Sequence, residues 1–230
     1  GEKLSLTYGE ILQNGNFYRD NLRTAKSTYC YVSNGDNRLI RPHFTFFGFR
    51  YVKVEGAKID KKTLDNFIGV SVRSDMAQTG RIETSNEKLN KFIENVFNSQ
   101  KDNFLDIPMD CPQRDERFGW TGDAQVFSET ALFNADCAAF YSKYLENMRQ
   151  EQLRYGGSCP FVVPDCFYAR EELYDGAKPV ENNDFMLGRT SAGWGDAAVI
   201  IPWNLYKFTG DKEELKKNYP NMKLWTEFLL

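Results

Sequence analysis

Residues 106–123 have the sequence DIPMDCPQRDERFGWTGD, the densest cluster of polar side chains in the chain. The stretch holds five carboxylates and two arginines. Pro108 and Pro112 forbid a regular helix there, and Gly119 and Gly122 weaken one further. We therefore predict a loop between helical segments, in which packing sets the side chains, as at many functional sites.

Carboxylates this close together cannot all ionise freely if they share a pocket. One is expected to have a raised pKa while Arg114 and Arg117 keep its neighbours charged. A glycosidase needs this division, because one protonated carboxyl donates to the leaving oxygen and others stay anionic near the cationic sugar. Trp120 would supply an apolar wall for a sugar face. The same residues also fit a structural ion-pair network, whereas a calcium site would call for an Asp-x-Asp-x-Asp loop that the sequence lacks.

Residues 110–123 resemble, nearly letter for letter, the signature of the bacterial α-L-rhamnosidases of glycoside hydrolase family 78. Residues 41–56 look like the strand block that precedes the catalytic domain in that family. Residues 193–203 look like its later helix-opening motif, and residues 21–25 fit more loosely. The resemblance therefore spans most of the chain.

The resemblance implies a multidomain chain in which β structure precedes α structure. Residues 1–82 would be the C-terminal part of a β-sandwich domain, and residues 83–230 the N-terminal part of an (α/α)6-barrel catalytic domain.

Local patterns agree with this order. Strands are predicted over residues 44–47, 49–54 and 67–72. The later part is predicted to hold helices and no strands, and Trp203 is expected in its core. The helices are predicted over 86–100 with Ser85 as cap, over 124–133, 138–154 and 197–208, from Asp211, and from about Pro220.

The roles of Glu116, Asp110, Asp123 and Trp120 are what the resemblance implies. It implies that Glu116 is the general acid of an inverting glycoside hydrolase that releases terminal α-L-rhamnose. Arg114 and Arg117 are expected to balance charge inside the motif. Asp196 would either face the cavity or cap a helix. The substrate-binding set is Asp110, Asp123, Trp120, Arg114, Asp196 and Trp194, with Asp165, Asn183 and Asp184 as further candidates in a long loop.

The general base of the family is a glutamate downstream of everything in this chain. The chain alone is therefore expected to be inactive or nearly so, and to be truncated at both ends. The expected partner of the whole protein is a rhamnose-containing glycoside or polysaccharide. Two alternatives stay open: a helical-barrel glycosidase of another sugar specificity, and a non-catalytic carbohydrate-binding or structural fragment.

Composition sets further limits. The formal net charge is −3 and 41% of residues are hydrophobic, so a packed core is expected and a nucleic-acid partner is not. No stretch is apolar enough to predict a membrane span. With five cysteines and one histidine, no zinc site or cofactor is expected, and the thiols are predicted to be mostly free and buried. No signal peptide is visible; a secreted or periplasmic location is slightly favoured for the whole protein and a cytoplasmic one stays open.

Overall fold

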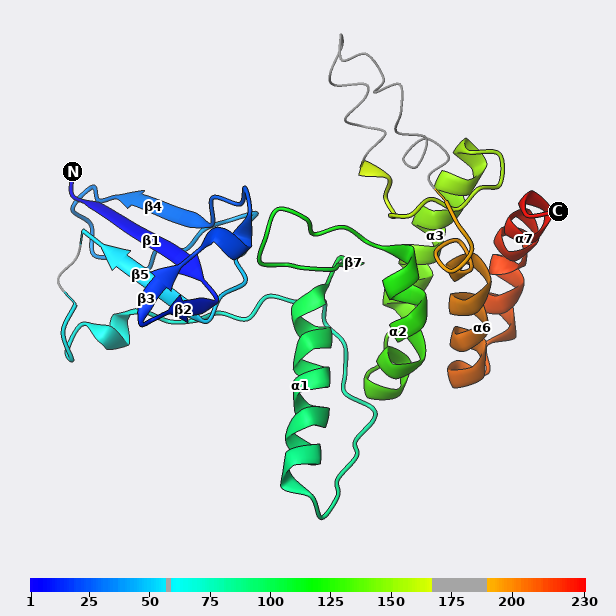
Figure 1. The fold of residues 1–230 in the computed structure, drawn as a ribbon, viewed down its shortest axis with the longest axis horizontal. Coiled ribbons are helices and arrows are strands. Elements are labelled where there is room, and N and C mark those ends of the chain that lie inside the picture. Colours follow the sequence, from blue (N-terminus) through cyan, green and yellow to red (C-terminus); the bar gives the residue numbers. More distant parts are fainter. Residues whose placement is uncertain (57–58, 167–189) are drawn as a thin grey trace, which may run out of the picture. The chain divides into compact units, whose positions relative to one another are not determined.

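The structure is a computed structural model that describes every residue except 57–58 and 167–189. The candidate residues Asn183 and Asp184 lie outside the described residues. A region of strands is followed along the chain by a region of helices (Figure 1), which confirms the predicted order of β before α structure. No described helix has the length and apolar character needed to cross a bilayer.

The chain divides into two compact units. The first unit is built from the N-terminal residues together with a short stretch from the middle of the acidic motif. The first unit comprises Gly1–Val72 and Cys111–Arg117, and the second comprises Arg73–Asp110 and Phe118–Leu230.

A three-stranded antiparallel sheet forms the centre of the first unit. Strand β1 (Lys3–Gly9) lies between β4 (Thr28–Val32) and β5 (Tyr51–Glu55). A separate hairpin joins β2 (Ile11–Gln13) to β3 (Asn16–Tyr18). Its two turn residues are an Asn-Gly pair with φ of 51° and 79°, the left-handed conformation that a tight hairpin turn requires.

Two of the predicted strands are wrong. Phe44 has a φ of 57°, which interrupts an extended run, and β5 begins only at Tyr51. The aromatic rings before β5 pack on the sheet, since the Phe47 and Phe49 rings lie 4.3 and 4.9 Å from that of Tyr8. Residues 67–72 join no strand in the described part of the chain, and Ile68 is 72% exposed.

Helices build the second unit, and α6 is central because it packs on α2, α3 and α7 (Figure 1). The helix predicted over 138–154 is confirmed as α3, and its side chains Tyr141, Tyr144, Leu145 and Met148 are fully buried. The helices are α1 (Glu87–Asn103), α2 (Thr121–Asn134), α3 (Ala138–Arg154), α6 (Ala197–Thr209) and α7 (Lys212–Phe228).

The starts of two helices differ from the prediction. Asn86, not Ser85, caps α1, because its side-chain oxygen accepts hydrogen bonds from the backbone N–H groups of Lys88 and Leu89. Helix α2 begins at Thr121, so the predicted loop ends before Asp123.

Helix α7 is one continuous helix, so the prediction of a helix start near Pro220 is wrong. Pro220 lies on the solvent side, where a missing N–H is tolerated. The next residue, Asn221, is fully buried and its carbonyl accepts a hydrogen bond of 3.2 Å from Gln152 of α3. Contacts with α3 therefore hold α7 together across the proline.

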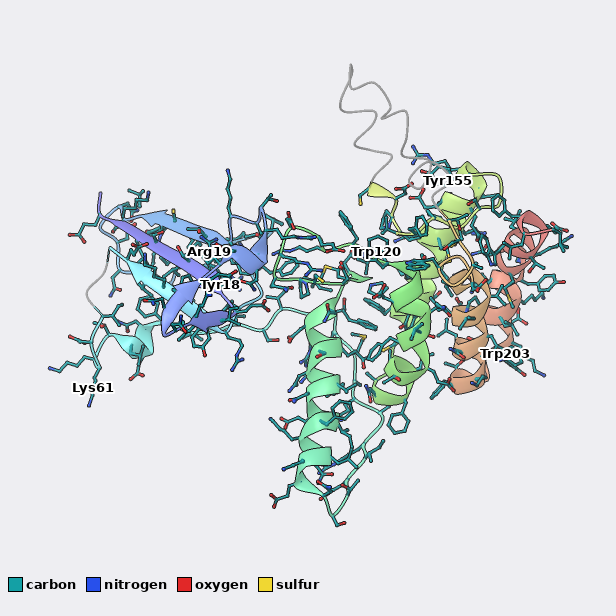
Figure 2. The ribbon with its side chains drawn as sticks, viewed as in Figure 1. Tyr18, Arg19, Lys61, Trp120, Tyr155 and Trp203 are labelled. Carbon is teal, nitrogen blue, oxygen red and sulfur yellow. The ribbon has the colours of Figure 1, made fainter. Side chains whose placement is uncertain are left out.

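Two further expectations for this part of the chain are corrected. A short hairpin of β6 (Phe104–Leu105) and β7 (Ile107–Pro108) lies in the region predicted to lack strands. Its turn residue, Asp106, has a φ of 68°. Trp203, expected in the core, is 49% exposed on α6 (Figure 2), where the centroid of the Tyr206 ring lies 5.6 Å from that of its own ring.

Cys30, Cys137 and Cys159 are free thiols, which agrees with the prediction for most of the five cysteines, but three of the five are not buried. Cys137 and Cys159 lie in the helical core, while Cys30 is exposed on β4, an edge strand. Cys111 and Cys166 are partly buried. Burial raises the pKa of the Cys137 thiol to about 12, which keeps it neutral at physiological pH.

Candidate active site

The acidic motif forms a loop that is closed at its base by its own backbone. The N–H of Asp110 donates to the carbonyl of Phe118 at 3.0 Å, and the N–H of Phe118 donates to the Asp110 carboxylate at 2.9 Å. Between these two residues the stretch Cys111–Arg117 belongs to the first unit. Asp110 therefore fixes the point at which the chain leaves the second unit.

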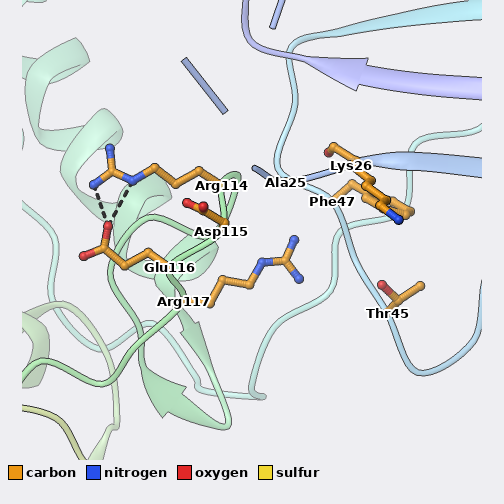
Figure 3. Close-up of a pocket in the computed structure, with 9 residues that line it drawn as sticks. Ala25, Lys26, Thr45, Phe47, Arg114, Asp115, Glu116 and Arg117 are labelled. Carbon is orange, nitrogen blue, oxygen red and sulfur yellow. Dashed lines mark hydrogen bonds and ion pairs between the residues drawn. The ribbon is translucent and has the colours of Figure 1, made fainter. Parts of the chain in front are cut away.

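Glu116 is held by two arginines within the first unit. Arg114 donates to its Oε2 atom from Nη2 at 2.9 Å and from Nε at 3.1 Å (Figure 3). Arg23 donates to the same oxygen from Nη2 at 2.8 Å. The Glu116 side chain is only 15% exposed. Arginines were expected to keep the carboxylates next to the proton donor charged. Here two arginines instead contact the carboxylate of the proposed donor itself.

Asp115 joins the motif to the N-terminal segment. It accepts hydrogen bonds from the hydroxyl and the backbone N–H of Thr24, and from Nε of Arg23 at 2.6 Å. The Thr24 hydroxyl first, and then its N–H and Arg23, hold the pKa of Asp115 below its usual range. One guanidinium thus spans two adjacent carboxylates.

Sequence reasoning missed the part played by Arg23 and Thr24. Their position is fixed by Leu22, which is fully buried at the end of the short 3-10 helix η1 (Asp20–Leu22), and by a φ of 56° at Arg23. A non-glycine residue in this conformation often marks a functional site. The only signal in the sequence was the loose match of residues 21–25 to the family.

A cavity of about 380 Å³ opens beside Glu116 in the first unit (Figure 3). Arg117 lines it and donates from Nη2 to the carbonyl of Phe46 at 3.0 Å, with its guanidinium 4.1 Å from the Phe46 ring centroid. Among the described residues of the first unit, Arg117 forms no ion pair with a carboxylate, and its expected role in charge balance within the motif stays a prediction. The lining residues are Ala25, Lys26, Ser27, Thr45, Phe47, Arg114, Asp115, Glu116 and Arg117.

The second half of the motif is built into the helical unit. The carbonyl of Gly119 accepts hydrogen bonds from the Tyr144 hydroxyl and the Val163 N–H, both at 2.9 Å. A Cβ at position 119 would lie 2.3 Å from the Val163 carbonyl oxygen, so only glycine fits. Trp120 follows as the N-cap residue of α2, and Asp123 lies exposed in the first turn of that helix.

Asp196 does not cap α6, which was one of its two expected roles. It occupies the N-cap position of α6, but its carboxylate makes no capping hydrogen bond. Instead it accepts from the Gly193 N–H at 2.8 Å and from the Trp225 indole N–H at 3.0 Å. Both carboxylate oxygens are therefore used to fix the entry of α6 and the core tryptophan of α7.

Trp194 and Asp165 have different surroundings. Trp194 is 39% exposed, packs edge-on against Phe161 at 5.6 Å, and covers Gly122, where a side chain would meet its ring. Asp165 is 5% exposed and accepts a hydrogen bond of 2.6 Å from the Tyr155 hydroxyl. Trp194 can therefore present a ring face to a ligand, whereas Asp165 is part of the packed interior.

Two family models together match all of the chain except residues 74–76. The model of the bacterial α-L-rhamnosidase 6 hairpin glycosidase domain matches residues 77–230. The chain belongs to the bacterial α-L-rhamnosidase family. The model of the bacterial α-L-rhamnosidase concanavalin-like domain matches residues 1–73, so the two matches meet close to the point where strands give way to helices.

Relatives within the rhamnosidase family agree in sequence and in fold. An α-L-rhamnosidase from Formosa agariphila is 41% identical over 98% of this chain and 23% of its own length. The crystal structure of an α-L-rhamnosidase from Aspergillus terreus superposes with a TM-score of 0.83 at 36% identity, over 98% of this chain and 24% of that one. A Streptomyces avermitilis α-L-rhamnosidase complexed with L-rhamnose has a TM-score of 0.79 at 34% identity, over 100% of this chain and 20% of that one. The chain thus spans under a quarter of the length of these relatives.

Proposed function

We propose that this chain acts within a longer protein that hydrolyses terminal α-L-rhamnosides with inversion, and that Glu116 is the general acid. The observation that carries the proposal is the position of Glu116, a mostly buried carboxylate on the wall of a 380 Å³ cavity. A cavity of this size suits a sugar ring. Support also comes from the family and from the relative that was crystallised with L-rhamnose.

The remaining parts of the site are proposed in the same way. The sugar would be contacted by Asp110, Asp123, Trp120 and Trp194. Arg114 would belong to the same substrate-binding set and would also orient Glu116. Asp196 would act by fixing Trp225. Residues 1–82 would complete a β-sandwich domain, and residues 83–230 would begin an (α/α)6 barrel. An inverting pair needs a second carboxylate about 6.5–9.5 Å from the acid, with a water between them. We propose that this base lies outside the 230 residues, so that the chain alone is inactive.

The proposed role requires a change in the protonation of Glu116. Two guanidinium groups on one carboxylate oxygen favour the ionised form, whereas a general acid must carry a proton. The Arg23 side chain is 49% exposed and that of Arg114 is 32% exposed. We propose that the more exposed contact, with Arg23, opens when substrate binds, so that Glu116 can take up the proton it later donates. Arg23 is then a positioning residue that acts through Glu116.

Replacing Arg23 with methionine is expected to move the alkaline limb of the pH–rate profile to higher pH. Loss of a contacting cation makes protonation of Glu116 easier, and a general acid loses activity as pH rises through its pKa. The same measurement on Arg23→Lys should restore part of the wild-type profile. Arg38→Met, on the surface of the same unit, is the matched control and should leave the profile unchanged. A lower rate with an unmoved profile would show that Arg23 only holds the loop.

The first experiment on the function itself compares three substrates of the full-length protein. We expect turnover of aryl α-L-rhamnoside and none of the matched aryl glucoside and galactoside. Turnover of only the latter two would identify a helical-barrel glycosidase of another specificity. Binding of rhamnose without turnover of any substrate would instead identify a carbohydrate-binding protein.

A further inference from the structure

We propose that Asp115 is a positioning residue for the hydrolysis: it anchors the Arg23 side chain and balances its charge, so that Glu116 can take up a proton while Arg23 keeps a partner. The inference rests on the proposed function, because it concerns the protonation of the proposed general acid. It assigns a role to a carboxylate that the proposed function leaves without one.

Asp115 holds Arg23 from two directions. Its Oδ1 atom accepts from Nε of Arg23 at 2.6 Å. Its Oδ2 atom accepts from the backbone N–H of Thr24, the next residue, at 3.2 Å and from the Thr24 hydroxyl. Arg23 has a φ of 56°, a conformation that a non-glycine residue keeps only when its surroundings impose it. Asp115 therefore fixes both the backbone after Arg23 and the Nε side of its guanidinium.

The other side of the same guanidinium contacts Glu116. Nη2 of Arg23 donates to Oε2 of Glu116 at 2.8 Å, a longer contact than the one between Nε and Asp115. A planar guanidinium can serve two carboxylates because its N–H donors point in different directions. Asp115 can therefore retain Arg23 at Nε when the contact between Nη2 and Glu116 opens.

Two cations and two carboxylates meet at this point. Asp115 and Glu116 are consecutive residues on the wall of the cavity (Figure 3), and Arg23 and Arg114 contact them. Without Asp115, protonation of Glu116 would remove the last counter-charge of Arg23 among the described residues, which is costly for a partly buried cation. The Thr24 hydroxyl, and then its N–H and Arg23, hold the pKa of Asp115 below its usual range. Asp115 is therefore the carboxylate of the two that stays charged.

The remaining charged and titratable groups of the loop and the cavity do not take this role. They are Asp110, Cys111, Lys26, Arg114 and Arg117. The three cations favour the ionised form of Glu116. Asp110 is engaged at the base of the loop by the Phe118 N–H. Among the described residues of the first unit, Asp115 is the carboxylate that shares a cation with Glu116.

Asp115→Asn is expected to move the alkaline limb of the pH–rate profile to lower pH, measured on the full-length protein with an unactivated α-L-rhamnoside. The expected shift is about one pH unit, the low end of what a nearby charge contributes, because the Asp115 side chain is 26% exposed. Asparagine keeps an oxygen that can accept from Arg23 but carries no charge, so Glu116 becomes harder to protonate. The direction is opposite to the one expected for Arg23→Met.

Three further variants separate charge from structure. Asp115→Glu keeps the charge and should keep the position of the limb. Asp65→Asn, the same change at an exposed site of the same unit, is the matched control and should leave the profile and the rate unchanged. In a protein that already carries Arg23→Met, Asp115→Asn should move the limb less than in the wild type, because the cation through which Asp115 acts is gone.

An active Asp115→Asn protein whose limb stays in place or moves to higher pH would overturn the inference. An equal shift with and without Arg23 would also overturn it, because Asp115 would then act independently of Arg23. Equal loss of activity at every pH in Asp115→Asn and Asp115→Glu would show that Asp115 is only structural. Failure of the wild-type protein to cleave any rhamnoside would instead overturn the proposed function.

Discussion

Replacing Glu116 with glutamine is expected to lower kcat for an unactivated α-L-rhamnoside by about 100- to 10,000-fold, the usual contribution of a general acid. Glutamine keeps the shape of the side chain but cannot donate a proton to the leaving oxygen. It can still accept hydrogen bonds from Arg23 and Arg114 through its amide oxygen, so the loop and the cavity should persist. The measurement is steady-state turnover of the full-length protein, with KM expected to change little.

The leaving group separates loss of proton donation from loss of folding. A rhamnoside of a good leaving group, such as 2,4-dinitrophenol, departs without protonation and should be cleaved by the Glu116→Gln protein at close to the wild-type rate. Glu55→Gln, on the exposed strand β5 of the same unit, is the matched control and should leave both substrates unaffected. An equal loss on both substrates would mean that Glu116 is structural, and unchanged turnover of the unactivated one would remove it from the mechanism.

Trp225→Ala is expected to destabilise the helical unit by about 3–5 kcal/mol, the usual cost of removing a buried tryptophan. Its indole is 1% exposed, stacks on Phe228 at 5.7 Å, and lies where any side chain at Gly195 would have to go. The substitution also removes the N–H that Asp196 accepts at 3.0 Å. The free energy of unfolding is measured by urea denaturation.

Trp203→Ala is the matched control for this prediction. Trp203 is the same residue type on a neighbouring helix, but it is half exposed, so the expected cost is about 1 kcal/mol or less. Equal destabilisation by the two substitutions would contradict the assignment of Trp225 to the core and of Trp203 to the surface.

Part of the fold could be predicted because it depends on local pattern. The predicted bounds of α3, residues 138–154, match the observed ones. Its apolar side chains Tyr141, Tyr144, Leu145 and Met148 recur at helical spacing, and no proline or glycine interrupts them. Helix α6 ends at Thr209, one residue after the predicted end, and its C-cap residue Gly210 has a φ of 69°, a left-handed conformation that glycine adopts readily. The two tryptophans show the limit of this method, because helical spacing does not reveal which face of a helix meets a neighbour.

Some features of the candidate site could likewise be predicted from the sequence, and others could not. The sequence by itself determined the family, the loop-forming prolines and glycines, and the grouping of Asp115 and Glu116 beside Arg114, because these depend on residues close together in the chain. Only the tertiary structure decided that Arg23, 93 residues before Glu116, shares its carboxylate, that Asp196 binds Trp225, and that Arg117 faces a cavity without a counter-charge from its unit. The physical reason is that charge pairing and burial depend on distances in space, which packing sets and which spacing along a single sequence does not contain.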